Sequence, residues 1–230
     1  MITVNYRILL VLLTVLATSC GIPYFISSNF EEITVNHKRI AILPFEMIYT
    51  GKQPDKMTQE QLDQISAAES KAFQISFHDL LLRSTKNGKK ALRVDVQHFD
   101  KTNRIFENNN VPVEDVLSLS SEELCKMLNV DAVVRCRVEK TRFMSDLASY
   151  GIDIGVELIN ILSNYALWPF IPGGLNVSKE IKSNYTLLDH ENGTTLWSTS
   201  YSTEADWSAS SNEIIESVIG RSVKRFPYRR

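Results

Sequence analysis

Apolar and polar residues alternate along parts of the chain in a way that predicts β-strands, because successive side chains of a strand point to opposite faces. The clearest stretch is residues 131–143, whose apolar members share one face: Ala132, Val134, Cys136 and Val138. Residues 91–99 alternate in the same way. Residues 38–46 form a nearly continuous apolar run, which predicts a buried strand that Pro44 closes. Three strands are therefore expected before residue 144.

A β-hairpin is predicted for residues 180–206, where two strand-like runs flank the tetrapeptide His190-Glu191-Asn192-Gly193. Asn-Gly is the strongest short-range signal for a tight hairpin turn. Trp197, in the second run, is expected in the core of the hairpin, because aromatic residues are favoured in strands.

Three helices are predicted from the same signature, a serine or threonine followed three residues later by Glu or Gln. The signatures begin at Thr58, Ser120 and Ser210. The first of these helices should stop near Asn87-Gly88, since Asn and Gly are typical of helix ends. Residues 100–110 form a short helix or a loop.

A helical insertion is predicted for residues 144–176, between the third strand and the hairpin. From Leu147 to Tyr165, polar residues recur every three or four positions and form a narrow stripe on a helix, and apolar residues fill the remaining circumference. An aromatic run of the kind enriched at interfaces follows. We interpret residues 147–172 as a protein-contact element, for self-association or for a partner; simple core packing is the alternative. The expected contact residues are Ile154, Leu158, Ile161, Trp168 and Phe170.

The order of elements, β-α-β-α-β followed by the insertion, the hairpin and a last helix, predicts an α/β fold. We expect one mixed β-sheet of about five strands with helices packed on it. Alternation within the strands favours a mixed sheet over a purely parallel one, because one face is then partly in contact with water. The size suits a single α/β domain over residues 37–230.

Composition narrows the class of partner. The chain of 230 residues has a formal net charge of −2, with 43% hydrophobic and 23% charged residues. This is an ordinary globular composition, and it argues against nucleic acid as a partner. Cys125 and Cys136 are flanked by apolar residues and are expected to be buried thiols, with a disulfide between them as the alternative. Scattered histidines and two isolated cysteines predict no metal site.

The first twenty residues have the features of a secretory signal. One base, Arg7, precedes an apolar run at residues 8–17, which is too short to span a bilayer. The sequence Leu16-Ala17-Thr18-Ser19-Cys20 resembles the lipobox of bacterial lipoproteins. That resemblance implies a signal peptide over residues 1–19 and acyl chains on Cys20 that hold the protein in the membrane. A cleaved, soluble secretory protein is the alternative.

The same resemblance implies a location in the cell envelope. Cys20 is followed by Gly21, not by the aspartate that usually retains lipoproteins in the inner membrane, which implies the outer membrane with the domain facing the periplasm. Residues 20–36 are expected to form a lipidated tether. Extended, such a tether reaches roughly 55 Å, enough to let the domain stand off the membrane.

Three short motifs, in order, resemble a family of bacterial lipoproteins. They are R-I-A-I-L-P-F at residues 39–45, the segment 128–134 ending in D-A-V-V, and L-D-x-x-x-G-x-x-L-W-S at residues 188–198. The family includes the curli secretion channel lipoprotein and the lipoprotein activators of penicillin-binding proteins. The resemblance implies a fold like the amino-terminal domain of TolB, with binding of proteins or self-assembly as the activity. The long alternating strands of the curli pore have no counterpart here.

No motif for catalysis or for a cofactor is present: the chain has no G-x-S-x-G, no H-E-x-x-H, no Walker loop and no G-x-G-x-x-G. Asp153 and Glu157, one helical turn apart, are candidates for the paired carboxylates of a hydrolase, with two exposed acids on a helix as the favoured interpretation. His78-Asp79 and His98-x-Asp100 are expected to be solvated polar residues. We therefore predict a non-enzymatic module for envelope assembly, secretion or cell-wall synthesis, without a cofactor. A subunit of a curli-channel-like export complex and a lipid-anchored hydrolase are the alternatives.

Overall fold

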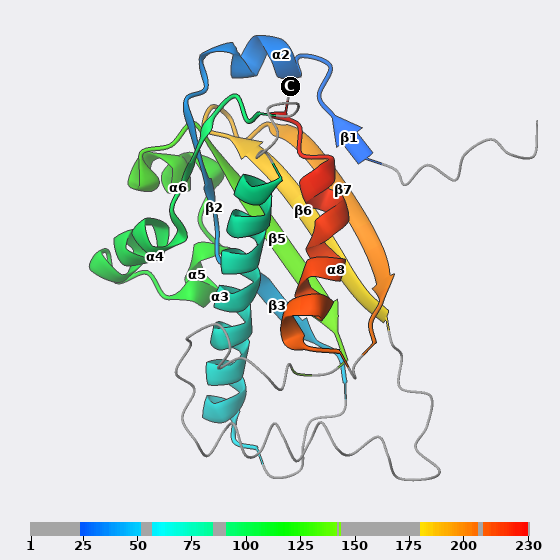
Figure 1. The fold of residues 1–230 in the computed structure, drawn as a ribbon. Helices are drawn as coiled ribbons and strands as arrows, with labels where there is room; N and C mark the ends of the chain where they lie inside the picture. The colour runs from blue at the N-terminus through cyan, green and yellow to red at the C-terminus, as the bar shows by residue number, and fades with distance from the viewer. Residues whose placement is uncertain are drawn as a thin grey trace, which may run out of the picture.

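A computed structural model of the chain describes residues 24–51, 57–84, 91–141, 143, 180–206 and 209–229. Its centre is a seven-stranded mixed β-sheet with helices on both faces (Figure 1). The strands run along the sheet in the order β1-β7-β6-β5-β2-β4, and β3 pairs with β5 off this path. Their bounds are β1 Tyr24–Ile26, β2 Arg39–Ile42, β3 Glu46–Tyr49, β4 Asp95–Gln97, β5 Ala132–Lys140, β6 Glu180–Asp189 and β7 Thr195–Glu204.

The sheet is mixed, as the sequence predicts. β2 pairs in parallel with β4 and β5, and β3 pairs in parallel with β5. The other pairs are antiparallel: β5 with β6, β6 with β7, and β7 with β1. The hairpin between β6 and β7 turns at Asn192 and Gly193, whose φ angles of 58° and 59° are those that Asn-Gly turns require. The predicted hairpin is therefore confirmed.

The prediction of about five strands was too low, for two reasons. Pro44, which lacks a backbone N–H, divides the predicted strand at residues 38–46 into β2 and β3, and both segments pair with β5. The backbone N–H of Leu43 between them still donates to the carbonyl of Val134, at 3.0 Å. The second additional strand is β1, which lies in the range predicted for the tether.

Residues 24–36 are ordered parts of the fold, so the tether predicted over residues 20–36 is shortened at its domain end. After β1 come α2 (Phe30–Ile33) and the 3-10 helix η1 (Thr34–Asn36). Phe30 is 4% exposed and packs in the main core, with its ring 5.4 Å from that of Tyr228. Burial of this aromatic side chain, with pairing of β1 to β7, holds the segment on the domain.

All three predicted helix starts are confirmed. Thr58, Ser120 and Ser210 each cap a helix and form the reciprocal capping box: α3 (Gln59–Arg83), α6 (Ser121–Leu128) and α8 (Ser211–Lys224). α3 ends at Arg83, a few residues before the predicted stop. Residues 100–110, predicted as a short helix or a loop, belong mostly to α4 (Phe99–Asn108). The sequence did not predict the short helix α5 (Val113–Val116).

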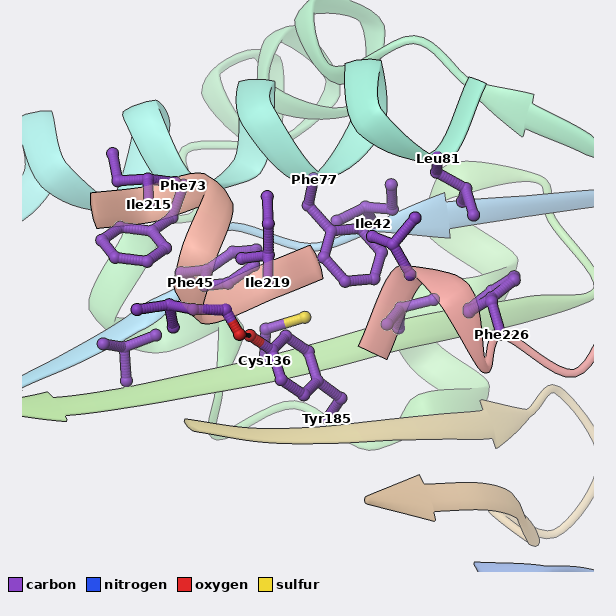
Figure 2. Close-up of a cluster of buried hydrophobic side chains, with 14 of the residues drawn as sticks. Ile42, Phe45, Phe73, Phe77, Leu81, Cys136, Tyr185, Ile215, Ile219 and Phe226 are labelled. Carbon is purple, nitrogen blue, oxygen red and sulfur yellow. Dashed lines mark hydrogen bonds between the residues drawn. The ribbon is translucent and has the colours of Figure 1, made fainter. Parts of the chain in front are cut away.

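The core has two parts on opposite faces of the sheet. α3 and α8 lie side by side on one face, and their aromatic and aliphatic side chains meet those of β2, β5 and β6 (Figure 2). α4, α5 and α6 cover the other face over β2, β5 and the hairpin end of β6. The outer parts of β6 and β7 on that second face are polar and exposed, including Lys182, Asn184 and Ser200. The expected contact with water is therefore found at β6 and β7.

Cys125 and Cys136 are free, buried thiols, as predicted. Cys136 lies in the α3/α8 core and Cys125 in the core under α6, so the sheet separates them and no disulfide joins them. Burial raises the pKa of Cys125 to about 12 and that of Cys136 well above its usual value. Both side chains therefore act as small apolar groups.

In the part of the chain that the structure describes, no helix is long and apolar enough to cross a membrane.

Candidate functional site

The residues predicted as the lipidation site, the contact element and the hydrolase pair lie outside the described part of the chain. Cys20 belongs to the first 23 residues, and the expected contact residues Ile154, Leu158, Ile161, Trp168 and Phe170 belong to residues 144–179. The hydrolase candidates Asp153 and Glu157 lie there too. These interpretations therefore remain predictions, and the described residues offer other features.

A groove of about 390 Å³ lies between α3 and α4 and reaches the start of α5. Its rim carries charges of both signs on exposed side chains, with Lys71 on α3 and Asp100, Arg104 and Glu107 on α4. Val113, 40% exposed, adds an apolar surface at one end. Sequence reasoning missed this groove, because it forms only where two separate helices pack together.

The floor of the groove is polar and fixed in place. The Gln74 side chain is fully buried, and its Nε2 donates to the Ile42 carbonyl at 2.8 Å and to Asn103 Oδ1 at 3.1 Å. Asn103 Nδ2 donates back to Gln74 Oε1 at 2.8 Å, so the two amides hold α3 against α4. Ser70, 3% exposed, lines the same groove, and its hydroxyl has no hydrogen-bond partner among the described residues. The Ser70 oxygen is also shielded from solvent, so this side chain belongs to the floor of the groove as a buried polar group.

A second cluster of polar side chains joins the hairpin turn to both ends of the domain. His37 Nδ1 lies 2.6 Å from the Tyr228 hydroxyl, and His37 Nε2 lies 3.1 Å from Asp189 Oδ1. His190 Nδ1 lies 3.4 Å from the same carboxylate oxygen and 3.0 Å from the Asp131 carbonyl oxygen. The Asp131 carboxylate accepts hydrogen bonds from the backbone N–H groups of Lys38 and Arg39, at 2.7 and 2.8 Å.

This cluster has the ligand types of a metal site, although the sequence predicted none. His37, Asp189 and His190 place one ligand atom each within 4.8 Å of one another. Imidazole nitrogens with a carboxylate oxygen suit Zn²⁺. These contacts satisfy a neutral His37 only in part: its Nδ1 accepts from the Tyr228 hydroxyl, whereas its Nε2 lies 3.1 Å from Asp189 Oδ1 without the geometry of a hydrogen bond. The cluster brings residue 37, the hairpin and residue 228 together.

Stability is expected to fall below neutral pH because of His37. Burial lowers the pKa of His37 below its usual value, against the opposing influence of Asp189 and Asp131, while nearby His190 lowers it further. Between the unfolded pKa near 6.5 and the lower folded pKa, the unfolded state binds more protons, so the free energy of unfolding decreases as pH falls. Urea unfolding at pH 7.5 and 5.5 should show a smaller decrease for His37→Gln than for the wild type. Equal decreases in the two proteins would contradict this role of His37.

His78 departs from the prediction of a solvated side chain. It is 4% exposed on α3, where its ring lies 5.1 Å from that of His98 and 5.4 Å from that of Phe99. Its Nδ1 lies 3.0 Å from Asp79 Oδ1. Packing of α4 over this face of α3 buries the imidazole, an effect that the local sequence does not reveal. His98 itself is exposed, as predicted.

No protein-family model matches the chain, and no curated protein matches it. Several solved structures are similar in part, and bacterial lipoproteins are among them. Lipoprotein GNA1162 from Neisseria meningitidis has a TM-score of 0.46 and 13% identity, over 82% of this chain and 96% of that one. The PelC dodecamer from Paraburkholderia phytofirmans has a TM-score of 0.42 and 11% identity, over 87% and 92%. The LpoB C-terminal domain from Salmonella enterica has a TM-score of 0.37 and 7% identity, over 76% and 92%. Likenesses this distant carry no conclusion about what the present chain binds.

Proposed function

We propose that this chain is a non-enzymatic envelope lipoprotein that is anchored through acyl chains on Cys20 and binds a partner protein in the periplasm. The lipobox-like sequence before Cys20 supports the anchor, and Gly21 after it supports the outer membrane. The observation that carries the binding role is the groove between α3 and α4.

The groove suits a segment of polypeptide. Its rim carries two basic and two acidic side chains, so it has no net preference for a polyanion or a polycation. Its interior offers the apolar surface of Phe106 and Val111 next to the buried Ser70 hydroxyl. Ligand-binding pockets are usually lined by apolar side chains with a few fixed polar groups. Their volumes are typically roughly 300–1,000 Å³.

The groove is poorly equipped for catalysis. Among the described residues that line it there is no histidine or cysteine, and its carboxylates, Asp100 and Glu107, are exposed on the surface of α4. Catalytic acids and bases are usually shielded from water so that their pKa values are tuned to the reaction. This supports binding over the alternative of a hydrolase.

The segment 147–172 remains a proposed second contact element, with Ile154, Leu158, Ile161, Trp168 and Phe170 as its contact residues. Its wide apolar arc supports contact with a partner or a second copy. A role as a subunit of an export complex would use the same element for self-association.

A cross-linking experiment in intact cells tests the proposal. A photo-reactive amino acid in place of Arg104 should yield one discrete protein adduct, and the same amino acid in place of exposed Lys126 on α6 should not. Charge reversal in the groove by Lys71→Glu should reduce the adduct at least fivefold. Adducts of equal yield at both positions would contradict a partner-binding role of the groove.

Palmitate labelling tests the anchor. The wild type should take up labelled palmitate, and Cys20→Ala should not. Palmitate uptake by Cys20→Ala would contradict the proposed acylation of Cys20.

A further inference from the structure

The strand β1 forms an apolar edge of the sheet. Tyr24, Phe25 and Ile26 are 54%, 51% and 41% exposed, although large apolar side chains are usually covered in a folded domain. β1 pairs with β7 on one side only and ends the strand order of the sheet. At the right of Figure 1 it lies at the margin of the sheet, away from α4, α5 and α6. Successive side chains of a strand point to opposite faces, so Tyr24 and Ile26 lie on one face of this edge and Phe25 lies on the other. This patch, residues 24–26, therefore borders the edge on both faces and needs a covering surface.

The length of chain before β1 limits what that surface is. Tyr24 is four residues after Cys20, and four residues span at most about 14 Å even when fully extended. β1 is itself fixed to the domain by its pairing with β7, which includes Tyr24 opposite Thr199 and Ile26 opposite Trp197. If acyl chains hold Cys20 at the membrane surface, this part of the domain cannot stand off by more than that distance.

We propose that residues 24–26 lie against the lipid headgroups of the membrane that holds Cys20, so that the domain rests on the bilayer by the β1 edge of its sheet. This inference rests on the anchor in the proposed function. Tyrosine and other aromatic side chains are favoured at the boundary between headgroups and acyl chains, where a ring is buried and its polar end stays hydrated. The exposed apolar side chains of β1 then have their cover without a protein partner.

The charges beside β1 suit this surface. The last turn of α8 and the residue after it present Arg221, Lys224 and Arg225 as exposed side chains. The Arg225 guanidinium lies 5.6 Å from the centre of the Tyr24 ring, which places this basic end of α8 next to the patch. Basic side chains near a bilayer are attracted to anionic headgroups.

This placement presents the groove to the periplasm. α4, which forms one wall of the groove, packs on β2 near the β4 edge, the edge opposite β1. At roughly 4.8 Å per strand, the six strands from β1 to β4 hold the two edges roughly 24 Å apart. The sheet would therefore act as a spacer between the membrane and the partner, a role that the sequence assigned to a flexible tether.

Photo-cross-linking to lipid tests the arrangement on the full acylated chain. A benzophenone amino acid replaces Phe25 in one protein and Val113, an exposed apolar residue beside the groove, in the other. Cells are grown with ³²P-phosphate so that their phospholipids are labelled, and are then irradiated. The protein with the probe at position 25 should carry at least tenfold more ³²P-lipid than the protein with the probe at position 113.

Two outcomes would overturn the inference: equal labelling at both positions, or an adduct at position 25 only with a second copy of the chain or another protein. Palmitate labelling of the same two proteins separates this failure from failure of the anchor. Palmitate uptake without lipid adducts at position 25 refutes the edge-on placement and leaves the lipoprotein proposal intact. Absence of palmitate refutes both. Thermal unfolding of each protein checks that these exposed positions tolerate the probe.

Discussion

Replacement of Lys140 by methionine is expected to lower the free energy of unfolding by about 3–5 kcal/mol, because it removes the ammonium group that balances the buried Glu69 carboxylate. Lys140 Nζ lies 2.6 Å from Glu69 Oε1, and each side chain is only 1% exposed. Lys140 ends β5 and Glu69 belongs to α3, so the ion pair joins the sheet to its longest helix. Burial lowers the pKa of Lys140, since the charged form loses its hydration.

The double variant Lys140→Met/Glu69→Leu should recover most of the stability lost by the single change. Replacing both members of a buried ion pair by apolar residues removes the desolvation penalty together with the attraction. Chemical denaturation of the wild type, the two single variants and the double variant gives the coupling free energy directly.

A matched control lies on the same strand. Arg137 on β5 binds Glu46 with two hydrogen bonds of 2.6 and 2.8 Å, but its side chain is 51% exposed. Arg137→Met should therefore change the free energy of unfolding by only about 0–1 kcal/mol. If Lys140→Met were as mild as Arg137→Met, the buried pair would not contribute as described.

Val134→Asp is expected to prevent folding of the domain. Val134 is fully buried in the first half of β5, between Ile42 on β2 and Leu187 on β6. An aspartate there would place a carboxylate in the α3/α8 core with no cation to pair with it, at a cost of several kcal/mol. Because a domain of this kind is stable by about 5–15 kcal/mol in total, the variant should be largely unfolded or aggregated.

The same substitution at an exposed valine provides the control. Val35 in η1 is 71% exposed, and Val35→Asp should shift the free energy of unfolding by no more than about 0.5 kcal/mol. Circular dichroism and thermal unfolding of the two variants make the comparison. A cooperative transition at the wild-type temperature for Val134→Asp would show that β5 is not the central strand of the core.

The sequence by itself determined the elements whose signals are local. The alternation at residues 131–143 gave β5 with Cys136 inside, and the boxes at Thr58, Ser120 and Ser210 gave the starts of three helices. The Asn-Gly pair at residues 192–193 gave the hairpin. In each case the physical cause, a side-chain period, a cap or a positive φ, lies within a few residues of its effect. The mixed α/β class followed from the order of these elements.

Tertiary structure alone decided the features that join distant residues. Three residues are too few to show a period, so β1 became a strand only because the edge of β7 was there to pair with it. His78 is buried because α4 packs across α3. The Lys140–Glu69 pair joins residues 71 apart in the chain, and the His37–Tyr228 contact joins residues 191 apart. The groove exists only between α3 and α4 once they are packed. Burial and partner geometry at such places depend on the whole fold, so no local pattern of residues could predict them.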